Sequence, residues 1–287
     1  MIGPFVGVLF DGFAYGMLLF LLSVGLSVTL GMMNFINLAH CAFGMLGGYV
    51  TVTLMNRLGW PFLASLPVAF VAAAVASVML ERTLYRRLYR ASELDQCLLT
   101  IGIVFMSVAA AAYIYGTVQQ PVRLPDYLQG SFVLAGVNFA VYRVFLVVNA
   151  LVITLALVAS LEWTRFGARV RAAVDNQRMA RGLGIDVDRT FAITFALGGG
   201  LAGLGGALAI GIVGLDPAFA FAFLVYVLIV VSVGGLGSIR GSFAAAAVLG
   251  ISDVAGKYYV PQLGAFLIYL VMVGLLMWRP TGLFGNR

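Results

Sequence analysis

The sequence predicts an all-α fold, namely a polytopic bundle of transmembrane helices with eight or nine spans, some of them short or broken. Composition is the first observation behind this prediction, because 62% of the 287 residues are apolar and only 10% are charged. A soluble domain carries about 25% charged residues, so a soluble enzyme and a disordered chain are both excluded. The second observation is that apolar residues gather in stretches of roughly the 20 residues that a helix needs to cross a bilayer.

The candidate spans follow one another along the whole chain. They cover residues 5–30, 37–56, 62–81, 98–116, 142–161, 191–213, 219–235, 242–257 and 262–278. Two of them, at 219–235 and 242–257, are short and are interrupted by glycine-rich sequence. We therefore expect broken or re-entrant helices there, which a membrane tolerates where they line a cavity or pack inside protein.

The basic residues predict the orientation of the bundle. Arginines collect in residues 81–95, in residues 162–190 and in the C-terminal tail, whereas 116–141 carries only Arg123, which Asp126 balances. By the positive-inside rule the first three regions are cytoplasmic and the fourth is external. The number of spans between these regions agrees and places the N-terminus outside. The net charge of +6 thus reflects membrane topology, and no nucleic-acid partner is expected.

The loop at 162–190 has the composition of a helix, since it is rich in Ala, Arg and Met. Small or polar residues recur at every fourth position, on what would be one face of a single helix: Ala172, Asn176, Ala180 and Gly184. Arginines surround this face: Arg171, Arg178 and Arg181. Gly182 and Gly184 would end the helix. A short helix with an exposed small-residue face and a basic rim is suited to lie in a groove of another protein; the alternative is an ordinary positive-inside loop that happens to be helical.

Short motifs follow one another in order along nearly the whole chain. In the loop just described, the pattern is Arg171-Ala-x3-Asn176-x3-Ala180-x3-Gly184-Ile185. The other stretches are Asn34-Phe-Ile-Asn37-Leu-Ala-His40, Met45-Leu-Gly-Gly-Tyr49, Glu81-Arg82 with Arg86-Arg87, Thr100-Ile-Gly102, Gly234-Gly-Leu-Gly-Ser-Ile-Arg-Gly241 and Arg279-Pro-Thr-Gly-Leu-Phe-Gly285. This set resembles the permease subunits of branched-chain amino acid ABC importers, the high-affinity Leu/Ile/Val type. Together the matches are specific, although none is so alone.

The resemblance implies a single permease domain over residues 1–287, placed in the bacterial inner membrane and importing branched-chain or related hydrophobic amino acids. It implies several partners: a second homologous permease, two ATP-binding cassette subunits and an extracytoplasmic substrate-binding protein. The chain is then a transport subunit, not an enzyme. It needs no cofactor of its own, because the partner ATPases use the ATP, and the sequence has no Walker A motif. The implied ATPase-coupling residues lie in the loop 162–190: Arg171, Ala172, Asn176, Arg178, Ala180 and Gly184.

Polar residues interrupt the apolar sequence at Asn34, Asn37 and His40. If the segment is helical, their i,i+3 spacing places them on one stripe. Polar side chains at membrane depth usually face a bundle interior or water, so the stripe either lines the translocation pathway or locks neighbouring helices by hydrogen bonds. No Cys, Asp or Glu cluster accompanies His40, so a metal site is not expected. The family usually has glycine after this histidine, where this chain has Cys41.

Two glycine-rich segments have different predicted roles. Gly199, Gly203 and Gly211 follow a small-xxx-small pattern that lets helices pack backbone to backbone in lipid. Gly235, Gly237 and Ser238 end a short span and expose backbone N–H groups and a hydroxyl. The matching segment of the family lies near the translocation route, and transporters often bind substrate at such helix ends. A plain tight turn is the alternative.

Two alternative functions remain open at this point. The same ABC machinery could carry urea, short amides or aromatic acids, because permeases for those cargoes share the pattern. An ion-coupled secondary transporter is a different class, and it would need an acidic residue within the membrane. Asp11 and Asp253 are the candidates. Both fall near predicted external ends, so we expect them at the membrane interface.

Overall fold

A computed structural model describes residues 2–33, 35, 37–89, 91–134 and 136–285 of the chain. The α-helices are α1 (Ile2–Met33), α2 (His40–Leu58), α3 (Phe62–Leu80), α4 (Arg86–Leu88), α5 (Glu93–Tyr115), α6 (Val141–Trp163), α7 (Arg165–Asp175), α8 (Gln177–Gly182), α9 (Val187–Ala209), α10 (Phe219–Gly234), α11 (Ile239–Tyr259) and α12 (Gly264–Trp278). A π-helical turn, η1 (Glu81–Tyr85), joins α3 to α4, and a 3-10 turn, η2 (Asp126–Leu128), precedes two strands, β1 (Ser131–Leu134) and β2 (Val137–Ala140).

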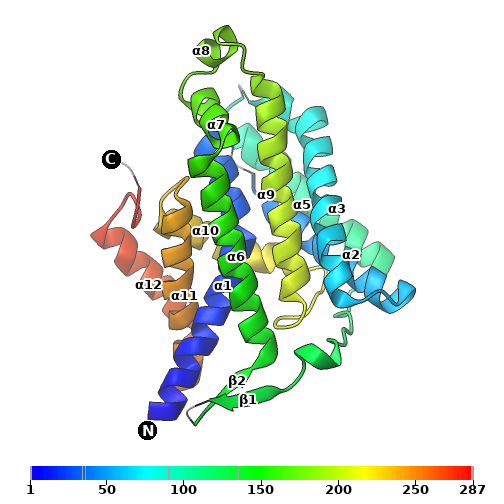
Figure 1. Ribbon diagram of the computed structural model, residues 1–287, viewed down its shortest axis with the longest axis vertical. Helices are drawn as coiled ribbons and strands as arrows, with labels where there is room; N and C mark the ends of the chain where they lie inside the picture. Colours follow the sequence, from blue (N-terminus) through cyan, green and yellow to red (C-terminus); the bar gives the residue numbers. More distant parts are fainter. Residues whose placement is uncertain (1, 34, 36, 90, 135, 286–287) are drawn as a thin grey trace.

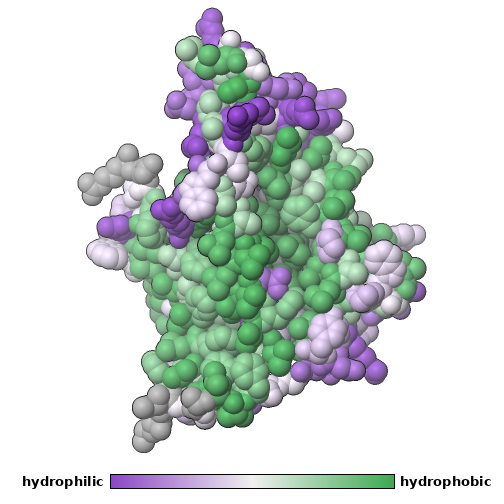
Figure 2. All heavy atoms as spheres, in the orientation of Figure 1, coloured by the Kyte–Doolittle hydropathy of each residue, from purple (hydrophilic) through white to green (hydrophobic). Residues whose placement is uncertain are grey.

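Among the described residues, six helices are long and apolar enough to cross a membrane: α1, α3 with its continuation to Leu88, α5, α6, α9 and α11. Two shorter apolar helices, α10 and α12, complete a set that confirms the polytopic helical bundle. The polar residues His40, Asn56 and Arg57 make α2 less apolar, and its first half is buried inside the protein. Figure 2 shows apolar side chains along the sides of the bundle, and a hydrophilic end where α7 and α8 lie.

The expectation of helices broken inside the segments 219–235 and 242–257 is wrong. Helices α10 and α11 are continuous, and the interruption lies between them. The described residues between α1 and α2, at 35 and 37–39, are not helical. In addition, the loop 116–141 contains a β-hairpin, in which Ser131 pairs with Ala140 and Leu134 with Val137.

Glycines bring α1, α2 and α9 together at the centre of the bundle. A Cβ added to Gly47 would lie 2.1 Å from the carbonyl oxygen of Gly203, and one added to Gly206 would lie 1.8 Å from that of Gly44. Helices α2 and α9 therefore cross backbone to backbone, as small residues allow in lipid. Gly199 and Gly203 also face α3, which confirms the predicted packing role of this segment. Gly211 lies beyond the end of α9, against the ring of Tyr142.

The two ends of the bundle differ, as Figure 1 shows. The start of α1 lies beside the hairpin, with Gly3 next to Gly136. At the other end, α8 lies close to the segment that follows α3, since Arg86 and Arg181 of α8 both contact Asp188 of α9. The C-terminal residues join this end, because the Leu283 amide donates to the carbonyl oxygen of Val233 at 2.7 Å. The arginine-rich regions are thus at one end, opposite the N-terminus, and their cytoplasmic location stays a prediction.

Candidate functional site

The arginine-rich loop forms two helices, α7 and α8, that meet at Asn176. The backbone of Asn176 is extended (φ −152°, ψ 96°), and its Oδ1 atom accepts a hydrogen bond from the Met179 amide at 3.0 Å. Asparagine is a strong N-cap because its side chain replaces a helical backbone partner. The predicted single helix is therefore wrong, and the four-residue repeat does not define one helical face.

Two alanines of this loop face the protein itself. Ala173 and Ala180 are buried and pack against Val187 and Phe191 of α9, because burying these methyl groups removes apolar surface from water. The predicted exposed small-residue face is therefore wrong for Ala180. The side chains that protrude are larger: Met179 is 64% exposed and Leu183 is 78% exposed.

The remaining predicted coupling residues have different environments. Arg171 donates from Nη1 to the carbonyl oxygen of Leu161, which ties α7 to the end of α6. Ala172 is half-buried, whereas Asn176, Arg178 and Gly184 are exposed. Gly184 has a positive φ of 79°, as a glycine that ends a helical segment commonly has. Arg178 makes no ion pair with any residue that the structure describes, so its guanidinium group is available to a partner.

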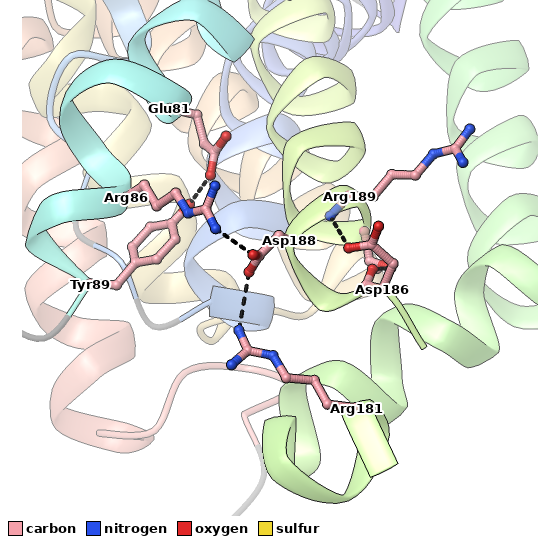
Figure 3. Close-up of polar contacts among 8 residues, drawn as sticks. Glu81, Arg86, Tyr89, Arg181, Asp186, Asp188 and Arg189 are labelled. Atoms are coloured by element: carbon pink, nitrogen blue, oxygen red, sulfur yellow. Dashed lines mark hydrogen bonds and ion pairs between the residues drawn. The ribbon is translucent and has the colours of Figure 1, made fainter. Parts of the chain in front are cut away.

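A polar network joins this loop to the other arginine-rich loop (Figure 3). Asp188, in the first turn of α9, pairs with Arg86 and, at 3.1 Å, with Arg181 of α8. Nearby, Tyr89 donates to the buried Glu81 carboxylate at 2.6 Å. Burial and this hydrogen bond raise the pKa of Tyr89 above its usual range, so the phenol stays protonated and remains a donor. The sequence did not single out Asp188. An acidic residue in the first turn of a helix is a local pattern, but the partner Arg86 lies 102 residues away.

The polar residues near the end of α1 do not form a helical stripe. Asn34 lies outside the described residues. Asn37 is 1% exposed and accepts a hydrogen bond on Oδ1 from the Tyr85 hydroxyl at 3.3 Å. His40 is 1% exposed, is hydrogen-bonded to the backbone of Leu22, and leaves Nε2 without a partner among the described residues. Both side chains therefore lie packed between helices in this conformation.

The glycine-rich segment between α10 and α11 is a tight turn. Gly235 and Gly237 have positive φ angles of 95° and 80°, which only glycine adopts readily. Ser238 caps α11 by accepting a hydrogen bond from the Gly241 amide at 3.0 Å. The turn lines a groove of about 720 Å³ at the hydrophilic end of the bundle, together with Glu162, Arg171 and other residues of α6 and α7.

An apolar cavity of about 300 Å³ lies between α2, α3 and α5. Its walls include Phe43, Met45, Leu46, Val50, Ala76, Leu80, Ile103, Ala110 and Ile114. Three hydroxyl-bearing residues, Tyr49, Ser107 and Tyr115, also line it. The Tyr49 hydroxyl is buried and has no hydrogen-bond partner among the described residues. Sequence reasoning did not find this cavity, because its three helices are brought together only by the fold.

The two acidic residues considered for ion coupling are both paired with cations. Asp11 contacts Arg143, and its side chain is 32% exposed. Asp253 accepts from Lys257 at 2.6 Å, but its side chain is only 1% exposed. Asp253 is buried among helices, and its charge is offset by Lys257 in the next turn of α11. The interfacial depth of both acids stays a prediction.

Comparison with known proteins decides the class. Residues 8–276 match the family described as branched-chain amino acid transport system, permease component. The chain belongs to this permease family. A probable branched-chain amino acid transport permease, LivH of Methanocaldococcus jannaschii, is 29% identical to the permease over an alignment of 288 positions that covers 94% of this chain and 90% of the relative. LivH of Escherichia coli K12 is 28% identical, covering 98% and 96% of the two chains.

A third relative, the high-affinity branched-chain amino acid permease BraD of Pseudomonas aeruginosa, is 26% identical over 97% of this chain and 95% of its own. No solved structure gives a significant match. The permease is therefore a multi-pass membrane protein and a transport subunit, not an enzyme. Its family is one of ABC importer permeases, which implies ATPase and binding-protein partners.

Proposed function

We propose that the permease imports branched-chain amino acids and that α7 and α8 form its docking element for the ATPase. The observation that carries this proposal is the family match over residues 8–276. The relatives LivH and BraD are described as branched-chain amino acid permeases. In the complete importer we place a second homologous permease, two ATP-binding cassette subunits and an extracytoplasmic substrate-binding protein beside this chain.

The shape and chemistry of α8 support the docking role. It protrudes at the hydrophilic end of the bundle (Figure 1). It carries the exposed Met179 and is followed directly by the exposed Leu183, and its Arg178 has no ion pair with any described residue. Apolar side chains exposed in this way at a helix tip favour burial in a groove of another protein. We therefore assign the docking contact to these three residues. Arg171 holds α7 to the end of α6 by its hydrogen bond to Leu161, and Ala180 holds α8 against α9.

The apolar cavity between α2, α3 and α5 supports the assignment of branched-chain amino acids as the cargo. A small apolar cavity with few polar groups suits a ligand that is mostly aliphatic, as the side chains of leucine, isoleucine and valine are. We propose that it forms part of the translocation pathway. Asn37 and His40 are packed between helices, which favours the locking role over direct contact with cargo. Gly235, Gly237 and Ser238 form the turn beside the groove, where they lie close to α7.

The test is reconstitution of the permease with its partner permease, ATPases and binding protein in liposomes. We expect leucine uptake that requires ATP and the binding protein and that isoleucine and valine inhibit. Uptake driven by a proton gradient without ATP would overturn the ABC mechanism, and competition by urea or aromatic acids alone would overturn the cargo. For docking, Leu183→Asp should abolish co-purification of the ATPase. Leu134→Asp, at an exposed position of the hairpin at the other end (63% exposed, against 78% for Leu183), should not.

A further inference from the structure

One carboxylate joins three elements at the hydrophilic end of the bundle. Asp188 belongs to the first turn of α9, Arg86 begins α4 and Arg181 lies in α8. Figure 3 shows both guanidinium groups pointing at the same carboxylate. We call this group, Arg86–Asp188–Arg181, the Asp188 clasp. The three side chains are 46% to 55% exposed, so the two ion pairs contribute little to stability. The clasp fixes the position of α8 relative to η1 and α4, the segment that follows α3.

On one side, Arg86 is tied to the interior of the bundle. It directly follows the π-helical turn η1, whose last residue, Tyr85, is fully buried. The ring of Tyr85 packs against Phe35 and Phe195, with centroid distances of 5.0 and 5.6 Å. Its hydroxyl donates to Asn37 at 3.3 Å. A displacement of Arg86 therefore moves a side chain that touches the junction between α1 and α2.

On the other side, α8 has few other attachments. Ala180 packs against Val187 and Phe191 of α9, and Arg181 reaches Asp188. The rest of α8 is exposed. A partner that pulls on Met179 or Leu183 therefore acts on the bundle through α9 and through the clasp.

The turn η1 is π-helical in this conformation and lies between the α-helices α3 and α4. A π-helical turn holds one residue more than the same length of α-helix, and such turns are frequent at functional sites. Reverting to α-helix would shift the residues after it by one position, a rotation of about 100° around the axis. Coupling between distant sites needs such a two-state element, biased from both ends.

We propose that Asp188 is the positioning residue that transmits movement of α8 to η1 and to the α1–α2 junction, and so couples ATP hydrolysis to transport. This inference rests on the proposed function. In this proposal η1 and α4 belong to the coupling machinery, although they do not themselves dock on the ATPase.

The test uses the complete reconstituted importer and the number of leucine molecules transported per ATP hydrolysed. Asp188→Asn should lower this ratio by about fivefold or more, the lower range of allosteric coupling, while ATPase co-purification and thermal stability match the wild type. Asp188→Glu should restore most of the ratio. Glu93→Gln is the matched control, because Glu93 is an exposed first-turn acid of α5 without an ion pair among the described residues.

Double variants separate the clasp from independent effects. If Arg86 and Asp188 act together, Arg86→Gln combined with Asp188→Asn should lower the ratio no further than the worse single variant. Three results would each overturn the clasp. The first is a double variant in which the effects of the two single variants on the ratio multiply. The others are an unchanged ratio in Asp188→Asn and a loss of ATPase binding in that variant. A wild-type importer that fails to couple uptake to ATP would overturn the proposed function itself, which distinguishes the two failures.

Discussion

The crossing of α2 and α9 predicts a large effect from a single methyl group. In Gly206→Ala, the new Cβ would lie 1.8 Å from the carbonyl oxygen of Gly44 and 2.4 Å from its carbonyl carbon. Ordinary contact begins near 3.4 Å, so the two helices must separate locally by about 1.6 Å. Both neighbouring atoms belong to the backbone, and no side-chain rotation relieves the clash. Because Gly47 meets Gly203 at the same crossing, the separation loses contacts there as well.

The expected magnitude follows from two opposing terms. Overpacking a close-packed site costs about 1–3 kcal/mol, and this backbone-to-backbone clash belongs at the upper end. Replacing glycine by alanine within a helix returns roughly 0.5–1 kcal/mol. We therefore expect Gly206→Ala to lose about 2 kcal/mol of unfolding free energy. Gly102→Ala is the matched control, since a Cβ on Gly102 of α5 meets nothing within 4 Å. That variant should be neutral or slightly more stable.

The assay is equilibrium unfolding of both variants in the same mild detergent, with tryptophan fluorescence as the probe of unfolding. The reasoning is refuted if Gly206→Ala and Gly102→Ala differ by less than about 0.5 kcal/mol, the usual range for substitutions without a specific mechanism. A loss of similar size in both variants would show that the substitution acts through helix flexibility and not through the crossing.

Three further predictions test the cap, the buried pair and the cavity. Asn176→Ala should cost about 1 kcal/mol locally, because it removes the N-cap of α8, and faster hydrogen exchange over residues 177–182 but not 165–175 would show it. Lys257→Met should destabilise the protein by about 2 kcal/mol: it leaves the buried Asp253 carboxylate unpaired, but the Lys257 side chain is 52% exposed, so the loss is below that for a fully buried pair. Asp253→Asn in the same chain should recover most of the loss in chemical unfolding, and no recovery would contradict the pairing argument. Ala110→Trp, which fills the cavity between α2, α3 and α5, should slow leucine uptake more than Ala109→Trp on the neighbouring exposed position, and equal uptake in the two variants would remove the cavity from the pathway.

The sequence by itself determined the class of protein and the segments that form its long apolar helices. Membrane helices are specified locally, by the length of an apolar stretch and by the charges beside it. The helices at α3, α5, α6 and α9 were therefore found close to their bounds, and the arginine-rich regions lie at one end of the bundle. The family was also readable from short motifs, because those are runs of neighbouring residues.

Only the tertiary structure decided how the arginine-rich loop is used. The spacing of Ala172, Asn176, Ala180 and Gly184 predicts one helical face, but the cap formed by Asn176 divides the helix. The methyl group of Ala180 is buried because Phe191 lies beside it, and periodicity alone does not tell which neighbour a face meets. For the same reason the partners of Asp188 and the walls of the apolar cavity could not be predicted. They depend on contacts between helices far apart in the chain, which packing brings together.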